Sequence, residues 1–298
     1  MLAAIAAVRR AVAAHADAAQ RDRDRSLEAM RAVGEFTRAH NTEQAERLIT
    51  KIAERLSPHD PFRQTWSTTR AFGVEDDEVR WTKWLAALLR PANGPRSARV
   101  TWTAMCDAIA RRVAERPLTG DAPLLDEPGW RSMASLEPEV HDEVRHPIYG
   151  QLDLLAMTSG AVVAIENKLW ADWHDSTSGK QADRYRALAR ERLGDPPTRR
   201  LGLVLLSQRD GLRAGEHYPL DYVHVSWRDV GQALRRALPP AWYADVGTTL
   251  EVWPVIQMLV AIERDLLDLD LTPLREGSAP PMVRIRQLMT LASYLDDR

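Results

Sequence analysis

Three charged residues interrupt the apolar stretch between Gly150 and Leu169. Asp153 comes first, Glu166 follows thirteen residues later, and Lys168 comes two residues after that. Carboxylate oxygens that leave coordination positions for water are ligands suited to Mg²⁺ or Mn²⁺. With a lysine beside the metal-bound water, such a set suits metal-assisted hydrolysis of a phosphodiester, in which the ion lowers the pKa of water and offsets charge on the phosphate.

Two strands must position these residues. The apolar pattern predicts them over 152–158 and 161–169, joined by a Ser-Gly turn of the kind that closes a hairpin. Residues two apart on a strand project to one face, so Glu166 and Lys168 point together. If the hairpin brings Asp153 beside Glu166, two carboxylates and an ammonium meet at one edge of a sheet.

A simpler structural interpretation competes with this one. Asp153 would cap the hairpin, while Glu166 and Lys168 would form a surface ion pair worth at most about 1 kcal/mol. Composition favours the chemical interpretation, because only four of the forty basic residues are lysines. Where nearly every other cation is an arginine, Lys168 supplies a compact charge with an adjustable pKa, which a rigid guanidinium does not.

The pattern D-x12-E-N-K on successive strands, followed by Q-A-D-R-Y on a helix predicted over 178–193, resembles the PD-(D/E)XK nuclease superfamily. The resemblance covers about residues 75–227. It implies an α/β fold class with a restriction-endonuclease-like α-β-β-β-α-β core around a mixed central sheet. Gln151 and Leu152 stand before Asp153, where the name of the superfamily has a proline that is often replaced.

The resemblance also implies roles for the charged residues. Asp153 and Glu166, with the backbone carbonyl of Asn167, would hold Mg²⁺ or Mn²⁺. Lys168 would position the attacking water and help to deprotonate it.

Two helices would complete this site. The helix predicted over 75–89 has an acidic residue before an L-A-A-L-L-R-P run, similar to the opening helix of one branch of the superfamily, and Glu78 matches the carboxylate that reaches the metal there. Helix-start chemistry is the alternative for Glu78, because acidic residues favour the positive end of a helix dipole. Gln181 and Tyr185, four apart on the later helix, would face the metal. A polar–aromatic contact that supports the sheet is the alternative for them.

Residues 170–200 indicate where a nucleic acid would bind. The formal net charge of −2 gives no sign of a basic face, but 180–200 contains seven basic and three acidic residues. Trp170 and Trp173, on the loop after the second hairpin strand, could stack on bases. The residues that could line a groove are Lys180, Arg184, Arg186, Arg190, Arg192, Arg199 and Arg200. Solvated arginines and indoles packed on helices are the alternatives.

The chain divides into three predicted parts. They are an N-terminal helical extension over 1–60, a nuclease-like core over 61–240 and C-terminal helices over 241–298 packed on the core. The N-terminal helices leave three roles open: an arm for a homo-oligomer, a docking module for a protein partner, or a cover for the sheet.

Other segments have distinct patterns. Residues 116–135 are predicted to form a Pro/Gly-rich loop. Residues 138–145 alternate as a strand with Val140 and Val144 on the same face, and 200–207 is an apolar run typical of a central strand covered on both faces. Further elements are predicted as a strand at 222–227 and helices at 97–115, 228–238, 249–267 and 282–295.

Composition excludes several classes of protein. The single Cys106 rules out a disulfide framework or a cysteine-rich zinc site within the chain. The apolar N-terminal stretch lacks a preceding charged region, and Arg9 and Arg10 interrupt it, which argues against a signal peptide. No run approaches eighteen apolar residues, so no membrane span is expected, and a cytoplasmic location follows.

Two functions remain in competition. The first is a divalent-metal-dependent nuclease, for which the resemblance implies a DNA substrate and a role in phage defence, restriction or repair, with RNA left open. The alternative is a catalytically silent binding or scaffold module that acts through its helical extensions. Such a module is expected to have lost Asp153, Glu166 or Lys168, and the presence of all three favours the enzyme.

Overall fold

The computed structural model describes a defined part of the chain. It covers residues 28–52 apart from 29, 38, 41 and 42, and then 56, 60, 67–74, 77–120, 123–169, 175–193, 199–208, 219–239, 241–242, 246–269 and 281–296. The side chains of 175–180, 246–249, 281–286 and 296 lie outside the description. Two compact units emerge, Met1–Arg55 with Gly277–Ala292, and Leu56–Glu276 with Ser293–Arg298.

In the first unit the described residues between 28 and 52 are helical, as the spacing of apolar residues predicts. The first part of α11 (Pro281–Asp296) belongs to the same unit.

The second unit is an α/β structure around a mixed five-stranded sheet in the order β1-β2-β3-β4-β5. β1, β2 and β3 are antiparallel neighbours, and β3, β4 and β5 are parallel neighbours. The predicted hairpin is therefore confirmed, and so is the central strand that follows it. The strands are β1 (Glu139–His146), β2 (Gly150–Met157), β3 (Ala161–Lys168), β4 (Arg200–Ser207) and β5 (Val223–Ser226).

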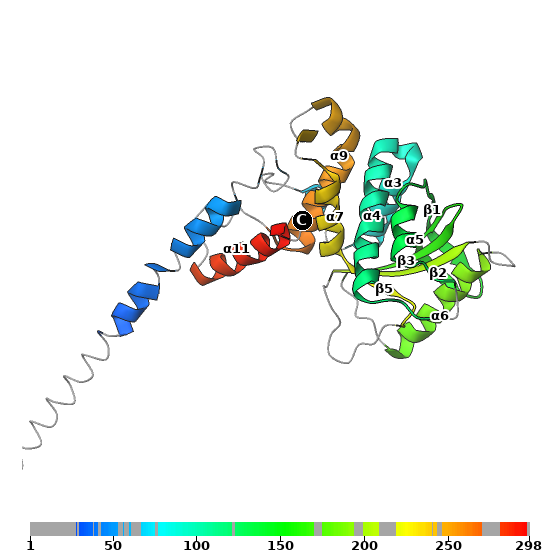
Figure 1. Cartoon of the computed structure of the whole chain (residues 1–298), viewed down its shortest axis with the longest axis horizontal. Coiled ribbons are helices and arrows are strands. Elements are labelled where there is room, and N and C mark those ends of the chain that lie inside the picture. The colour runs from blue at the N-terminus through cyan, green and yellow to red at the C-terminus, as the bar shows by residue number, and fades with distance from the viewer. Residues whose placement is uncertain are drawn as a thin grey trace, which may run out of the picture. The chain divides into compact units, whose positions relative to one another are not determined.

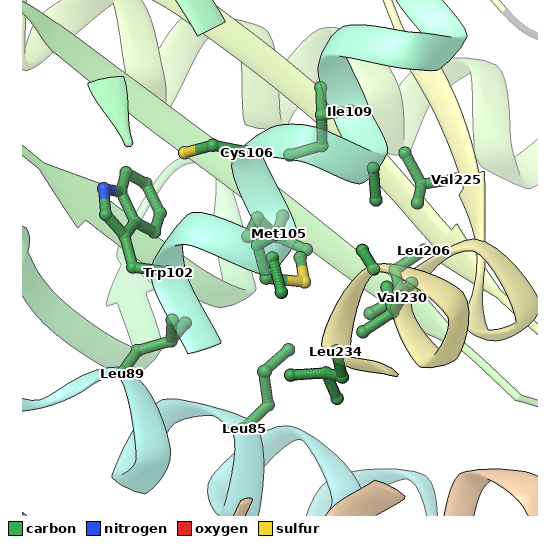
Figure 2. Packing of buried hydrophobic residues seen from close by; sticks show 14 of the residues in the cluster. Leu85, Leu89, Trp102, Met105, Cys106, Ile109, Leu206, Val225, Val230 and Leu234 are labelled. Atoms are coloured by element: carbon green, nitrogen blue, oxygen red, sulfur yellow. The ribbon is translucent and has the colours of Figure 1, made fainter. Parts of the chain in front are cut away.

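Helices cover both faces of this sheet (Figure 1). On one face α4 (Pro95–Glu115), with α3 (Glu78–Leu89) and α7 (Trp227–Ala237), packs on Leu206 and Val225. Figure 2 shows side chains from these three helices together with Leu206 and Val225 in one cluster. On the other face α6 (Asp175–Glu191) buries apolar strand residues in a smaller cluster. Both faces of β4 are apolar because both are covered, which explains its uninterrupted run.

The remaining described helical elements lie around this core. They are α2 (Thr68–Ala71), the 3-10 turn η2 (Pro91–Asn93), α5 (Glu127–Met133), α9 (Val246–Ala261) and the π-helical segment η3 (Ile262–Leu266). Within the described ranges, no helix is both long and apolar enough to cross a membrane.

Helix α5 corrects the prediction of a loop over 116–135. Asp126 caps the helix by accepting a hydrogen bond from the Gly129 N–H, and Pro128 is tolerated in the first turn because its missing N–H has no partner there anyway. Trp130 and Met133 are buried, so tertiary packing holds a helix that the Pro and Gly signals conceal.

Partway along the β1–β2 hairpin, the apolar side chains change from one face of the sheet to the other. Val140 and Leu154 pack on the α4 side of the sheet, whereas Val144 and Leu152 pack on the α6 side. The prediction that Val140 and Val144 share one face is therefore wrong. The reversal occurs at Glu143, whose φ of 49° lies in the left-handed region.

Candidate metal and active site

The candidate site lies where β2 and β3 separate. Their ladder ends at the Leu154–Ile165 pair, although β2 continues along β1 as far as Gly150 and β3 continues along β4 as far as Lys168. The strands therefore diverge at the position where Asp153 would meet its partner on β3. A polar opening forms at this point in an otherwise apolar sheet.

Asp153 bridges the opening to β3. Its Oδ2 accepts a hydrogen bond of 2.9 Å from the backbone N–H of Asn167, in place of a ladder bond. The N–H and C=O of one strand residue point to the same side, so the Asn167 carbonyl is directed to the same opening. Burial raises the pKa of Asp153, and the Asn167 N–H acts in the opposite direction.

Glu166 is the most buried acid of the site, with 2% of its surface exposed. Its Oε1 accepts hydrogen bonds from Lys168 Nζ at 2.7 Å and from Gln181 Nε2 at 3.0 Å. Its Oε2 is buried and has no hydrogen-bond partner among the described residues. Burial, and next the nearby charge of Asp153, raise the pKa of Glu166 to about 8, against the opposing effect of Lys168.

The two carboxyl groups form a close pair. Each carboxyl group acts on the pKa of the other, so Asp153 and Glu166 lie close together in the structure. Two ionised carboxylates cannot donate to each other, so the pair needs either a shared proton or a cation. Glu166 Oε2 has no donor among the described residues, and a buried carboxylate oxygen of this kind, in a group beside a second carboxyl group, fits a hard divalent cation.

Lys168 joins the acids through its ammonium group. Its own burial acts to lower its pKa, but the charges of Glu166, Glu78 and Asp153 outweigh this effect and raise the pKa above the ordinary value. The side chain is therefore a charged ammonium at neutral pH. This state suits orientation of a water molecule and neutralisation of the acids better than removal of a proton from water.

Glu78 lies at the edge of this group, as the first residue of α3. Asp77 caps the helix and leaves Glu78 Oε2 to accept the Leu169 N–H at 2.9 Å, while Oε1 lies 3.5 Å from Lys168 Nζ. Across the described ranges, no group of three or more His, Cys, Asp or Glu side chains is arranged as a metal-binding cluster. Through its two contacts Glu78 lies at the end of β3, whereas the close carboxyl pair is Asp153 with Glu166.

Gln181 and Tyr185 meet on one face of α6, as their spacing predicts. Gln181 Nε2 donates to Glu166 Oε1 and also to the Tyr185 hydroxyl. Tyr185 is 4% exposed, and burial followed by the charge of Glu166 raises its pKa. Both residues support Glu166, and the buried phenol acts through Gln181.

Asn167 uses its side chain on the opposite face of β3. Its Nδ2 donates to Thr82 Oγ1 on α3, and its Oδ1 accepts from Trp227 Nε1 at the start of α7, each at 3.1 Å. The amide is buried and holds two helices against the strand. Sequence reasoning missed Thr82 and Trp227, because contacts across 85 and 60 residues leave no local pattern.

The candidate nucleic-acid residues are placed unevenly. Trp170 and Trp173 lie outside the described residues, as does the side chain of Lys180, while Arg184 is exposed on α6. Arg186 does not line an open groove, because it forms ion pairs with Asp221 and Asp183, and Arg200 pairs with Asp126 at 2.6 Å. The guanidinium groups of both arginines are therefore engaged by carboxylates of the protein.

Sequence reasoning also missed a polar pair next to Lys168. Ser207 occupies the same register position on β4, and its Oγ forms a hydrogen bond of 2.6 Å with His224 Nε2 on β5. The signal that could have found Ser207 is its position as the first polar residue after an apolar central strand. His224 carries no such signal.

No family model, curated protein or solved structure matches the chain in comparisons with known proteins.

Proposed function

We propose that the protein is a divalent-metal-dependent nuclease with a restriction-endonuclease-like fold of the PD-(D/E)XK type. One observation carries the proposal: the buried Glu166 carboxylate lies beside the Asp153 carboxyl and pairs with the Lys168 ammonium through Oε1, while its Oε2 has no donor among the described residues. The order of antiparallel and parallel strands, with α3 before β1 and α6 between β3 and β4, supports the fold.

Each residue has a separate task in this proposal. Asp153, Glu166 and the Asn167 carbonyl would hold Mg²⁺ or Mn²⁺, with Glu78 at the edge of the site. When bound, the cation supplies an acidified water and stabilises charge on the phosphate. Lys168 orients the attacking water and offsets negative charge.

The supporting residues fix this geometry. Gln181 holds Glu166 Oε1, and Tyr185 holds Gln181. Because both lie on α6, the helix sets the orientation of the Glu166 carboxylate before substrate binds. Such pre-organisation lowers the cost of reaching the transition state.

The expected substrate is DNA, with RNA as the comparison. The same chemistry serves phage defence, restriction and repair. The proposed ligands are carboxylate and carbonyl oxygens throughout, and such oxygens suit Mg²⁺ and Mn²⁺.

The test is cleavage of plasmid, linear and single-stranded DNA, and of RNA, by the purified full chain with Mg²⁺, with Mn²⁺ and with EDTA. Cleavage should require the metal and should fall at least about 100-fold in Asp153→Asn, Glu166→Gln and Lys168→Ala. Glu139→Gln, at an exposed position of the edge strand β1, is the control for loss of one carboxylate. Full cleavage by Lys168→Ala or Asp153→Asn would contradict the proposal. Metal-independent binding of nucleic acid without cleavage would favour the scaffold alternative.

A further inference from the structure

Gln181 and Tyr185 can support Glu166 only if α6 keeps one position and one rotation on the sheet. The helix packs on the strands through apolar side chains, among them Ala182 and Leu188. Apolar packing is not directional, so it opposes small shifts of the helix only weakly. A shift of about 1 Å is enough to break the hydrogen bond of 3.0 Å between Gln181 Nε2 and Glu166 Oε1, since such bonds extend to about 3.2 Å.

Two polar contacts join α6 to the loop that precedes β5. Arg186 donates to both carboxylate oxygens of Asp221, from Nη2 at 2.7 Å and also from Nε. The Tyr222 hydroxyl donates to the backbone carbonyl of Ala182 at 2.9 Å. Positions 182 and 186 are about one helical turn apart, so the loop holds this turn of α6 at two points.

The two points lie beside the residues that support Glu166. Ala182 directly follows Gln181, and Arg186 directly follows Tyr185. The loop therefore acts on the same turn of α6 that contacts the carboxylate. Directional contacts here fix the height and rotation of that turn, which apolar packing leaves loose.

The loop is itself held by the rest of the unit. The Thr119 N–H donates to the Leu220 carbonyl at 3.1 Å, and the Tyr222 N–H donates to the Pro219 carbonyl at 3.0 Å. Asp221 and Tyr222 are both buried. The carboxylate that Arg186 contacts is thus a fixed point, against which the helix is positioned.

A second carboxylate near Arg186 provides a contrast. Asp183, on α6 itself, also pairs with this arginine, but its side chain is 73% exposed, whereas that of Asp221 is 9% exposed. A pair within one helix does not hold the helix against its neighbours. Only the pair with Asp221 joins α6 to the loop.

We propose that Arg186 and Asp221 are positioning residues of the candidate site, which hold α6 so that Gln181 keeps Glu166 in the orientation that binds the cation. This inference rests on the proposed nuclease function. Neither residue touches the metal or the substrate, and each acts through Gln181.

The test measures Mn²⁺ affinity by calorimetric titration, and kcat on a DNA oligonucleotide, in full-chain variants that urea unfolding shows to be folded. Asp221→Asn and Arg186→Met should each weaken Mn²⁺ binding and lower kcat by about ten-fold, because a ligand displaced by about 1 Å is costly. Arg186→Lys, which keeps a cation, should recover part of the loss. Asp183→Asn, which changes the exposed partner of the same arginine, is the matched control and should resemble the parent.

A second comparison separates positioning from a general effect on the fold. In a Gln181→Leu background, adding Asp221→Asn should weaken Mn²⁺ binding by less than about two-fold more, because the hydrogen bond that α6 positions is already absent. Effects that are independent of Gln181 would instead multiply.

The outcomes distinguish this inference from the proposed function. If the parent binds Mn²⁺ and cleaves DNA, and Asp221→Asn does both equally well, the positioning role is wrong and the nuclease stands. An undiminished effect of Asp221→Asn in the Gln181→Leu background would also overturn it. If the parent binds Mn²⁺ but cleaves no DNA, the proposed function fails, and the affinities still decide the positioning role. A parent that binds no Mn²⁺ overturns both.

Discussion

Glu143 lies opposite Asp153 in the β1–β2 hairpin, between the ladder pairs Asp142–Leu154 and Val144–Leu152. Its φ of 49° puts it in the left-handed region, which non-glycine residues adopt at a cost of about 1–2 kcal/mol. The hairpin reverses its faces at this point, so Asp153 leaves the regular alternation and reaches across to β3. The left-handed backbone of Glu143 therefore orients the side chain of Asp153 toward β3.

A change at Glu143 should act on metal binding through this backbone. Glu143→Gly should keep Mn²⁺ affinity and change the free energy of unfolding by less than about 1 kcal/mol, because glycine accepts a positive φ. Glu143→Val should weaken Mn²⁺ binding by about ten-fold or more and destabilise by about 1–3 kcal/mol. Calorimetric titration with Mn²⁺ and urea unfolding measure these quantities. Glu143→Gln removes only the exposed pair with Lys83 and should resemble the parent.

The stability of the metal-free protein should depend on pH through Glu166. Its pKa rises from 4.5 to about 8 on folding, so the folded state keeps a proton that the unfolded state loses in this range. The free energy of unfolding in EDTA should therefore fall as pH rises from about 4.5 to about 8, and Glu166 should contribute at most about 1.4 kcal/mol per pH unit to the slope. Urea unfolding between pH 5 and 8 measures the slope.

Two further measurements check this assignment. Glu166→Gln should reduce the slope without abolishing it, because burial also raises the pKa of Glu263, to about 7. Glu139→Gln should leave the slope as in the parent. Binding of Mg²⁺ to the parent at pH 7 should release protons, which calorimetry in buffers of different ionisation enthalpy detects. An equal slope in Glu166→Gln would contradict the shared proton.

Removal of the Asn167 amide should lower stability. Asn167→Ala leaves the buried Trp227 Nε1 without this acceptor and removes the donor to Thr82 Oγ1, which still donates to the Glu78 carbonyl, at a cost of about 1–3 kcal/mol. Urea unfolding should show this loss. Asn93→Ala, which removes an exposed amide, should cost less than about 1 kcal/mol. Because the proposed ligand is the backbone carbonyl, folded Asn167→Ala should still bind Mn²⁺.

Loss of Arg235 should be the most destabilising of these changes. Its guanidinium is 2% exposed and donates to both oxygens of Asp60 at 3.0 Å and to Glu263, which also accepts from Tyr294. Arg235→Met leaves two buried carboxylates without their cation and should cost about 3–5 kcal/mol in urea unfolding. The neighbouring Arg236→Met removes a more exposed pair and should cost about 1 kcal/mol. Equal losses would contradict the role of burial.

Much of the sheet could be predicted from local pattern. The hairpin was predicted at 152–158 and 161–169 and is found at Gly150–Met157 and Ala161–Lys168, and β4 matches its prediction. Alternation, a two-residue turn and an apolar run depend only on residues close in sequence. Local pattern did not predict helix α5, because Pro128 and Gly129 are typical of loops. The helix is stabilised by packing of Trp130 in the core, which local pattern does not show.

The candidate site was predicted in part. Asp153 with Glu166, and Gln181 with Tyr185, were expected to meet and do so. The ion pair of Arg186 with Asp221 and the support of Asn167 by Thr82 were not foreseen. Each joins segments whose separation carries no repeating pattern.

The sequence by itself determined which acids and which amine are present, and on which strands they lie, because side-chain period and turn chemistry are local properties. Only the tertiary structure decided that Asp153 crosses to β3, that one oxygen of Glu166 is buried with no donor from the described part of the chain, and that Ser207 lies beside Lys168. These relations depend on a left-handed residue in a neighbouring strand and on the packing of helices from distant segments, which local pattern does not encode.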